Sequence, residues 1–424
     1  MRPTLDPAIN YGFGHELLLA CMLTQILDND EWNMFAVNLT CLGCGATYSP
    51  NESVVVCEKC GDVLDVRYDM TKIQRSIKKA SLKNRVHSLW RYRELLPITN
   101  DSCIVSLGEG MTPTVQVSRY GALLKNLRKL SLKLDYLNPT GAFKDRGSTV
   151  SVSKLREMNI TAVMEDSSGN AGASLAAYCA AAGIECTLYV PSGAPSEKLL
   201  QAKLYGAKIR TIAGSRTDVA KAAENAWRTT GLYYASHNLS AFFLEGMKTF
   251  AYELAEDMSW EVPEHVVFPV GGGALLAGAW KGFEELLQLG WVKRLPRFHC
   301  VQSEACMPIV EAHRRGAMQV GPAQEGETIA GGIRIANPPR GRQVLEILYR
   351  SSGQAVAVSD QAILQHQKAL ARNEGIFAEP TSCAALAGLE KLFDTGAIAA
   401  DESVVVAITG FGLKDSKNAA NSIS

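Results

Sequence analysis

Short apolar runs alternate with longer helical patterns from about residue 100 to the end of the chain, and this alternation constrains the fold most strongly. Such runs are typical of strands buried on both faces, and helices between them make neighbouring strands parallel. We therefore expect an α/β fold with mostly parallel sheets. The predicted strands are 130–137, 161–166, 186–191, 208–213, 265–270, 298–303, 355–359 and 403–409. The predicted helices include 145–159, 171–183, 196–206 and 217–230.

Four loops at the carboxyl ends of predicted strands hold the candidate functional residues, because ligands bind there in parallel sheets. The first contains Lys144, at the entry of a predicted helix and beside Arg146. A desolvated lysine near positive charge has a lowered pKa and an amine free to form a Schiff base, whereas position alone favours a solvated lysine. In the second loop, Asn170 either caps a helix or offers its amide to a phenolic oxygen. Small residues around it leave N–H groups free for a carboxylate or phosphate.

The third loop begins with Gly271, Gly272 and Gly273, between a predicted strand and a helical pattern. It fits neither G-x-G-x-x-G, because Leu276 holds the last glycine position, nor a P-loop, because no Lys-Ser/Thr pair follows. In the fourth loop, Thr409 ends a predicted buried strand with a neutral hydroxyl. A lysine amine, two anion cups, an amide and a neutral hydroxyl match pyridoxal phosphate, which has an aldehyde, a phosphate, a phenol and a ring nitrogen.

A cysteine module precedes this region. Two C-x-x-C pairs, each followed by glycine, are separated by twelve residues and consist of Cys41, Cys44, Cys57 and Cys60. Two such turns direct four thiolates at one tetrahedral ion, which predicts a closed structural zinc (Zn²⁺) site. A pair of redox C-x-x-C turns is the alternative. Four thiolates leave no open coordination position, so we expect no chemistry at this zinc.

Composition argues against several classes of function. The chain has 43 Lys and Arg against 43 Asp and Glu, so no basic field exists to attract nucleic acid or an anionic membrane. The apolar stretch 17–27 is interrupted and too short to span a bilayer. The cysteines outside the module show no pairing pattern, which fits a reducing cytoplasm. We expect a cytoplasmic protein that acts on a small molecule, without nucleic-acid or membrane partners.

Several motifs resemble those of the tryptophan-synthase-β-like pyridoxal phosphate enzymes, and within them the threonine synthase family. They are NPTGAFKDRG, SSGNAGAS, VGGGALLAG, EPTSCAALAG and TGFGLKD, together with LGEGMTPTV and TIAGGIRIANPPRG. The cysteine module is similar to the N-terminal zinc ribbon of many threonine synthases. The resemblance covers roughly residues 36–415 and implies the conversion of O-phospho-L-homoserine and water into L-threonine and phosphate.

The resemblance also implies a role for each residue that matches a family motif. Lys144 would bind the cofactor covalently and later move protons. Asn170 would bind the phenolic oxygen of the cofactor, and Thr409 its ring nitrogen. The cofactor phosphate would lie against Gly271, Gly272, Gly273 and Ala274, and the carboxylate of an amino-acid substrate against Ser167, Ser168 and Ala171.

Two departures from the family keep other functions open. Many threonine synthases have G-N-x-G-N in the phosphate loop, whereas plain glycines, as here, are nearer to ammonia-lyases of the same fold. Phe243 holds a position where several synthases place an arginine against the substrate phosphate, so another cation would be needed; the candidates are Arg146, Lys248, Arg334 and Lys414. The alternatives are a threonine or serine ammonia-lyase, a β-replacement enzyme similar to cysteate synthase, and a degenerate binding module without activity.

The expected organisation is an uncertain leader at 1–35, a zinc-ribbon module at 36–68 and a catalytic domain at 69–424. A smaller subdomain, inserted at about 145–240, is expected to close with the remainder over the cofactor. Translation from Met34 would instead make the preceding residues a leader without a role in the fold. Homodimerisation is what the resemblance implies. Three further side chains are expected near the crevice or its helix entries, namely Asp145 as a cap or partner of Arg146, His237, and Glu379.

Overall fold

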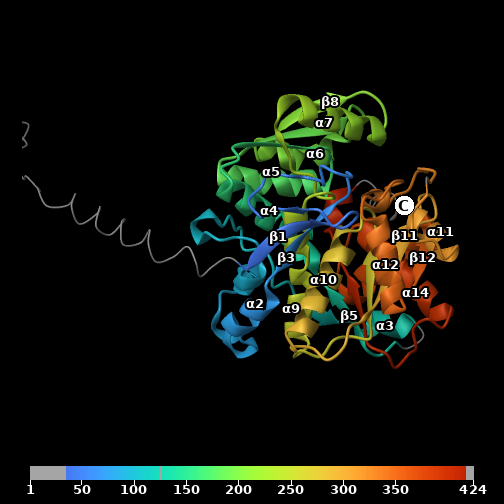
Figure 1. The fold of residues 1–424 in the computed structure, drawn as a ribbon. Coiled ribbons are helices and arrows are strands. Elements are labelled where there is room, and N and C mark those ends of the chain that lie inside the picture. The colour runs from blue at the N-terminus through green and yellow to red at the C-terminus, as the bar shows by residue number, and fades with distance from the viewer. Residues whose placement is uncertain (1–34, 125–126, 322, 417–424) are drawn as a thin grey trace, which may run out of the picture.

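A computed structural model of the chain describes residues 35–124, 127–321 and 323–416. Met34 and all of the expected leader except Phe35 lie outside these ranges. The described residues form a six-stranded sheet, a four-stranded sheet and a small three-stranded sheet (Figure 1). The small sheet is antiparallel and lies against helices of the six-stranded one; it consists of β1 (Ala36–Cys41), β2 (Thr47–Tyr48) and β3 (Leu64–Tyr68).

The six-stranded sheet has the strand order β12-β11-β10-β13-β5-β4, and every neighbouring pair is parallel except β4 with β5. Its parallel strands are linked by crossover segments that contain helices, as such pairing requires. The strands are β4 (Thr114–Gln116), β5 (Leu130–Lys133), β10 (His265–Pro269), β11 (Arg297–Ser303), β12 (Ala355–Val358) and β13 (Val404–Ala407).

The helices form the remaining layers, and within the described ranges none is long and apolar enough to cross a membrane. The α-helices are α2 (Met70–Ser76), α3 (Ser118–Leu123), α4 (Asp145–Glu157), α5 (Asn170–Ala182), α6 (Ser196–Leu204), α7 (Arg216–Thr230), α8 (Ala241–Met247), α9 (Thr249–Asp257), α10 (Ala274–Gln288), α11 (Pro308–Arg314), α12 (Gly341–Ser351), α13 (Asp360–Glu374) and α14 (Pro380–Asp394). The 3-10 helices are η1 (Lys79–Asn84), η2 (Leu89–Leu95), η3 (Asp101–Cys103), η4 (Asp135–Leu137), η5 (Gly331–Ile333) and η6 (Gly412–Asp415).

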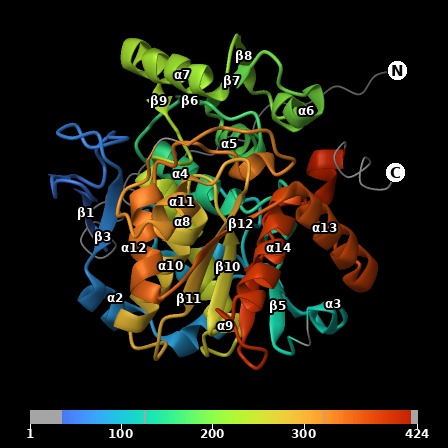
Figure 2. The same cartoon turned by 90° about the vertical axis from the view of Figure 1, so that its right-hand side faces the viewer.

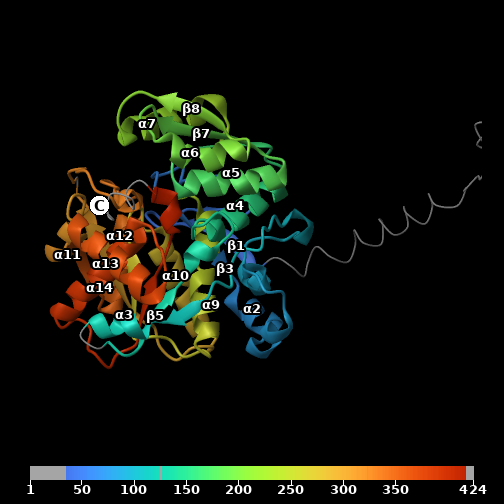
Figure 3. The ribbon, with the colours of Figure 1, turned by 180° about the vertical axis from the view of Figure 1, so that it is seen from behind.

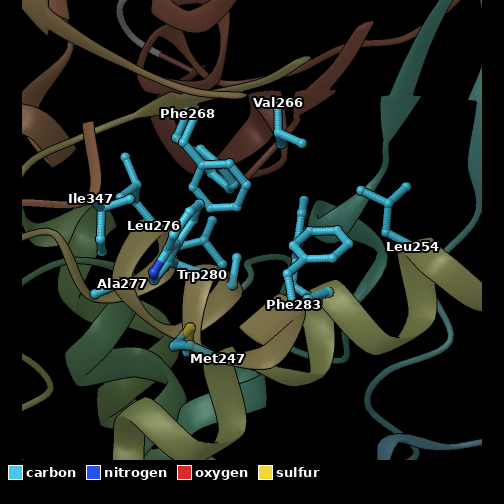
Figure 4. Packing of buried hydrophobic residues seen from close by; sticks show 14 of the residues in the cluster. Met247, Leu254, Val266, Phe268, Leu276, Ala277, Trp280, Phe283 and Ile347 are labelled. Atoms are coloured by element: carbon cyan, nitrogen blue, oxygen red, sulfur yellow. The ribbon is translucent and has the colours of Figure 1, made fainter. Parts of the chain in front are cut away.

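Side chains of the six-stranded sheet alternate between two apolar clusters. Val266 and Phe268 belong to a cluster formed with α9, α10 and α12, whereas Val267 belongs to a cluster formed with α13 and α14. Figure 4 shows Phe268 beside Trp280 of α10, and Figure 3 shows α14 on the opposite side of the strands from α9. The strands are therefore buried on both faces, which explains their continuous apolar runs.

The four-stranded sheet is entirely parallel, with the order β8-β7-β6-β9. In Figure 2 it lies at the top of the view with α7, and α4 and α5 lie between it and the larger sheet. Leu175 of α5 and Val219 of α7 share its apolar cluster. Its strands are β6 (Ala162–Glu165), β7 (Glu185–Pro191), β8 (Lys208–Ile212) and β9 (Tyr233–Tyr234).

The α/β class with parallel-rich sheets, predicted from the sequence, is confirmed. One predicted strand is too long: β5 ends at Lys133, and residues 135–137 form η4 instead of continuing to 137. Asp135 causes the bend, because its carboxylate turns inward to bond Arg146 and Thr112, both of which are buried.

Candidate active site

Lys144 lies at the entry of α4, in a turn that follows η4. In this turn Gly141 has a φ of +83°, a conformation that side chains disfavour. Asp145 closes the turn, because its carboxylate accepts hydrogen bonds from the N–H and the hydroxyl of Thr140, each at 2.7 Å, and from Ser174 at 2.6 Å. Both expectations for Asp145 are therefore wrong: its carboxylate neither caps α4 nor pairs with Arg146, but holds the turn beside Lys144 through Thr140 and Ser174.

The amine of Lys144 lies among aromatic rings. Its Nζ is 4.6 Å from the ring centroid of Phe143 and 5.8 Å from that of Phe243, and it hydrogen-bonds to none of the described residues. Burial lowers the pKa of Lys144 to about 8, and the carboxylates of Glu165 and Glu379 oppose this shift. A lysine with this pKa is partly neutral near pH 7, so it can act as a nucleophile or a base.

Ser167, Ser168 and Asn170 lie in the loop between β6 and α5, with Gly169 as the residue before the helix. The backbone N–H groups of Ser168, Asn170 and Ala171 have no acceptor among the residues that the structure describes. Unpaired N–H groups at the start of a 13-residue helix attract an anion. We call this group of residues, Ser167 to Ala171, the first anion cup.

Gly271, Gly272 and Gly273 form the turn between β10 and α10. Their N–H groups and that of Ala274 also lack an acceptor within the described part of the chain. A Cβ atom at Gly271 would lie 2.7 Å from the carbonyl oxygen of Gly332, and Gly273 has a φ of +95°. The turn therefore requires glycine, and it presents four free donors at the start of a 15-residue helix. We call residues 271–274 the second anion cup.

Gly271→Ala is expected to weaken cofactor binding, because the added methyl group must displace the backbone at Gly332. We expect the dissociation constant for pyridoxal phosphate to rise by roughly tenfold or more, since a small displacement of several charge-assisted hydrogen bonds costs about 1.5–3 kcal/mol. Titration followed by the absorbance of the cofactor measures this. Gly193→Ala is the matched control, because a Cβ there meets no atom within 4 Å. Equal affinity in both variants would contradict the assignment of the cup.

Asn170 is joined to Glu379 across the two sheets. Its Nδ2 lies 3.2 and 3.1 Å from the two carboxylate oxygens of Glu379, so the side chain does not cap α5. Glu379 is 7% exposed and immediately precedes Pro380, the first residue of α14. Burial raises the pKa of Glu379, while Asn170 and Lys414 oppose the shift. This carboxylate fixes the orientation of the Asn170 amide.

Thr409 lies two residues beyond β13 and is 1% exposed. Its hydroxyl is 3.0 Å from that of Ser382, whose oxygen also accepts the N–H groups of Thr409 and Gly410 at 2.9 Å each. The carbonyl of Thr409 accepts the N–H of Phe143 at 2.9 Å. Ser382 of α14 therefore holds the loop that carries Thr409, and this loop is in turn bonded to the turn that carries Lys144.

The topology explains why these loops meet. Strands β10, β13 and β5 are neighbours in the six-stranded sheet, so the second anion cup, Thr409 and Lys144 follow adjacent carboxyl ends. The first anion cup comes from the other sheet and is reached through the contact between Asn170 and Glu379. An unpaired amine, two anion cups, an amide and a neutral hydroxyl fit pyridoxal phosphate and an amino-acid carboxylate.

Two of the four candidate cations for a substrate phosphate are wrong. Arg146 is fully buried, and its guanidinium donates to both carboxylate oxygens of Asp135 and of Glu253. Lys248 is also fully buried and lies 2.6 Å from Glu245 in an ion pair. Both charges are already paired with buried carboxylates and neither side chain is exposed, so neither is available to an external anion.

The other two cations have freer donors. Arg334 pairs with Glu327 on the surface at 2.7 Å. Lys414 is half-buried beside the turn of Lys144, where its Nζ donates to the carbonyl of Thr140 at 2.6 Å and to Gln201 at 2.7 Å. An ammonium group has three donors, so Lys414 retains one.

The four cysteines of the module gather at one point. All four sulfur atoms lie within 4.8 Å of one another, so they could hold a metal ion. The Sγ atoms of Cys41 and Cys60 are 3.4 Å apart, and those of Cys44 and Cys57 are 3.6 Å apart. The N–H groups of Gly43 and Cys44 point at the sulfur of Cys41, at 3.3 and 3.4 Å.

Sequence reasoning missed two residues of this region. Glu165, the last residue of β6, is fully buried and influences the charge of Lys144. Asn238 directs its side-chain oxygen at Gly272, and its carbonyl accepts a hydrogen bond from Arg340 at 3.0 Å. For Glu165, the available signal in the sequence was a charged residue at the end of an apolar strand. No such signal existed for Asn238, because its position depends on how the two sheets pack together.

Comparison with known proteins agrees with this geometry. A family model described as "Pyridoxal-phosphate dependent enzyme" matches residues 105–410, which contain both anion cups, Lys144 and Thr409. The chain therefore belongs to the pyridoxal-phosphate dependent enzymes. It is 40% identical over 376 residues to a threonine synthase of Methanocaldococcus jannaschii, with 88% of this chain and 92% of that protein covered. It is also 40% identical over 379 residues to a threonine synthase of Methanosarcina acetivorans, with coverage of 89% and 92%.

Solved structures show the same fold at lower identity. A diaminopropionate ammonia lyase from Escherichia coli matches with a TM-score of 0.64 and 18% identity, over 75% of this chain and 88% of that chain. At this identity the likeness concerns the fold, and it carries no information about the substrate.

Proposed function

We propose that this chain is a threonine synthase, which converts O-phospho-L-homoserine and water into L-threonine and phosphate. The observation that carries the proposal is the pair of unpaired anion cups around a lysine of lowered pKa, in a chain 40% identical to threonine synthases. One cup serves the phosphate of the cofactor and the other the carboxylate of the substrate. Relatives of this identity and coverage favour the synthase over the ammonia-lyase, β-replacement and binding-module alternatives.

The residues present fit pyridoxal phosphate, which, when bound, withdraws electrons and makes the hydrogens of an attached amino acid acidic. Lys144 would hold its aldehyde covalently, and residues 271–274 its phosphate. Asn170 would meet its phenolic oxygen and Thr409 its ring nitrogen. Because Thr409 has a neutral hydroxyl, it does not impose a positive charge on that nitrogen.

Lys144 would also move protons on the substrate. An amine with a pKa of about 8 can accept a proton from Cα and later release one to Cγ. A proton also leaves Cβ, and its bonding electrons form a double bond to Cγ as the bond between Cγ and the phosphate oxygen breaks and its electron pair leaves with the phosphate. Cγ then takes up a proton, which leaves the double bond between Cα and Cβ, and Cα regains its proton when water adds. Phe143 and Phe243 keep the amine in an apolar setting, which favours its neutral form.

Lys414 is our candidate for contact with the substrate phosphate, because its remaining donor lies beside the turn of Lys144. Lys414→Ala is expected to raise KM for O-phospho-L-homoserine roughly tenfold or more with a smaller change in kcat, since loss of a charge-assisted hydrogen bond costs about 1.5–3 kcal/mol. Steady-state kinetics measure this, with the exposed Lys368→Ala as control. An unchanged KM would remove Lys414 from the site.

The decisive experiment for the function incubates the purified protein, loaded with pyridoxal phosphate, with O-phospho-L-homoserine. Release of phosphate in step with threonine formation supports the proposal. No turnover of this substrate, with ammonia released from threonine or serine, would instead identify an ammonia-lyase. Turnover of phosphoserine that depends on sulfite would identify a β-replacement enzyme similar to cysteate synthase.

We also propose that the cysteine module binds one structural zinc ion. Zinc–thiolate bonds of about 2.3 Å place neighbouring sulfurs of a tetrahedron about 3.8 Å apart. The sulfur separations of 3.4 and 3.6 Å are close to that distance. Four thiolates close the site, so the zinc supports the fold of the module and takes no part in the reaction.

Metal analysis is expected to find about one zinc ion per chain, as a closed four-thiolate site predicts. Cys57→Ser should lose most of this zinc and lower the melting temperature, because the short module depends on the metal for its fold. Cys103→Ser, which changes a half-buried cysteine outside the module, should keep the zinc content and the melting temperature of the wild type. Protein that contains neither zinc nor iron would contradict the assignment.

The remaining expectations are part of the same proposal. We propose a module at 36–68 and a catalytic domain at 69–424 with a smaller subdomain at about 145–240, and the residues that form each of the three sheets support this division. Cytoplasmic location is supported by the described cysteines, all of which are unpaired. A homodimer is proposed from the family resemblance, and the molecular mass in solution tests it.

A further inference from the structure

A histidine and a glutamate outside the residues assigned above form a buried pair beside Lys144. Glu165 ends β6, and His237 follows β9, which is the parallel neighbour of β6. Both residues therefore lie at the carboxyl edge of the four-stranded sheet, the same edge that carries the first anion cup. Glu165 is fully buried, and the side chain of His237 is 12% exposed.

The contacts fix which nitrogen of His237 carries a proton. One carboxylate oxygen of Glu165 accepts the backbone N–H of His237 at 3.1 Å and is in close contact with Nδ1 of the ring. A carboxylate only accepts, so Nδ1 must donate. In the neutral ring Nε2 is then the free acceptor, and it hydrogen-bonds to no residue that the structure describes.

His237 and the amine of Lys144 lie around the same aromatic ring, and burial, together with the charge of Lys144 acting on the imidazole, lowers the pKa of His237. The ring of Phe243 contacts both: its centroid is 6.0 Å from that of His237 and 5.8 Å from the Nζ of Lys144. The position of Phe243 is itself fixed, because a Cβ atom on Gly147 would lie 2.5 Å from its ring. Lys144 and His237 therefore both border the ring of Phe243.

The carboxylate of Glu165 has one oxygen without a hydrogen-bond partner among the described residues. This oxygen is buried, and a buried oxygen without a partner is costly for a group that serves structure alone. A carboxylate in this state stabilises an imidazolium when Nε2 takes up a proton. The charged groups that face His237 are Lys144 from α4 and Glu165 and Asp166 from the end of β6.

We propose that His237, oriented by Glu165, is a second acid–base residue of the site and accepts the proton of the water that adds to the substrate. This inference rests on the proposed threonine synthase function. The reaction needs one proton carrier for the carbon atoms and another for water. When water adds at Cβ, Lys144 must hold the proton that Cα takes up, so it cannot also accept the proton of water.

The step balances as follows. An O–H bond of water breaks as its oxygen forms a bond to Cβ, and the proton passes to Nε2 of His237. The double bond between Cα and Cβ breaks at the same time, and its electron pair moves to Cα, which takes up a proton from Lys144. The resulting imidazolium is stabilised by Glu165 and then returns the proton to solvent or to the released phosphate. Glu165 touches no reacting atom, so it is a positioning residue, whereas His237 is a catalytic one.

The test follows two products of O-phospho-L-homoserine, phosphate and threonine, with the holoenzyme. In His237→Gln we expect phosphate release to persist while threonine per phosphate falls by roughly 100-fold, a typical contribution of one acid–base group. The unhydrated four-carbon product should instead leave the site and hydrolyse to 2-oxobutyrate and ammonia. His87→Gln, which changes an exposed histidine, is the control and should behave as the wild type.

The pH profile separates this role from a structural one. In the wild type, the ratio of threonine to phosphate should fall at acidic pH, because protonated Nε2 cannot accept a proton. In Glu165→Gln this fall in the ratio should occur at a lower pH, because the carboxylate of Glu165 raises the pKa of His237 and its loss lowers that pKa. Cofactor absorbance confirms that each variant is folded and loaded.

Different results overturn the two proposals. Wild-type protein that releases no phosphate overturns the threonine synthase function and this inference with it. Active wild type whose product ratio does not change with pH overturns the role of His237 alone, and this measurement needs no variant. An unchanged product ratio in folded His237→Gln does the same.

Discussion

Lys144→Ala is expected to abolish threonine formation, by at least roughly 10³-fold, because the variant loses both the amine that holds the cofactor and the base that moves protons on the substrate. The absorbance band of covalently held cofactor should also disappear. The fold should remain intact, since Nζ of Lys144 makes no hydrogen bond with a described residue. Assays of phosphate and threonine, together with a visible spectrum, measure these effects.

Lys208→Ala is the matched control for this experiment. Lys208 is an exposed lysine that pairs with Glu185 on the surface of the four-stranded sheet. Exposed ion pairs contribute little to the stability of a protein. The Lys208→Ala variant should keep wild-type activity and the absorbance band of covalently held cofactor. Full activity with an unchanged spectrum in Lys144→Ala would disprove the central assignment of the site.

Arg146→Met should have the largest effect on stability. Arg146, Asp135 and Glu253 all have fully buried side chains, and the arginine bonds both carboxylates. Without it, two carboxylates remain inside the protein short of a partner, which costs about 3–5 kcal/mol or more of the free energy of unfolding. Chemical denaturation measures the loss. Arg156→Met, at an exposed position of the same helix, should cost much less.

This network also predicts a pH dependence. Burial alone would raise the pKa of Glu253, but Arg146 and Lys133 outweigh it and lower the pKa to about 2. The stability that this group contributes is therefore present above its ordinary pKa and is lost as pH falls toward 2. Arg146→Met should weaken this dependence. Native stability combined with a raised KM in Arg146→Met would show instead that the arginine binds substrate phosphate.

The loops of the site could be predicted because each carries its own local signal. Glycines with forced backbone conformations, small residues at a helix start and a lysine after a turn are visible in the sequence. The rule that ligands lie at the carboxyl ends of parallel strands then brought Lys144, Gly271 and Thr409 together without knowledge of the strand order. The order β10-β13-β5 makes them neighbours.

Pairings between particular side chains could not be predicted in this way. Asn170 with Glu379, and Glu165 with His237, join residues that are 209 and 72 positions apart. The first pairing depends on how the two sheets pack together, and the second on which strands are neighbours within the four-stranded sheet; no periodic pattern encodes either. The same limit explains why Arg146 was expected beside a substrate phosphate: its charge is visible in the sequence, but its burial against Asp135 is not.

The small antiparallel sheet has a consequence for anyone who shortens this chain. Asp65 and Tyr68 of β3 bond Lys281 and Glu245, which are themselves paired in the interior of the larger unit. Glu245 belongs to α8, the helix that also presents Phe243 to Lys144. A shortened chain that lacks residues 1–68 would expose Lys281 and Glu245 to water without their partners Asp65 and Tyr68. The surface around these two residues would therefore have to be redesigned in a minimal catalytic fragment.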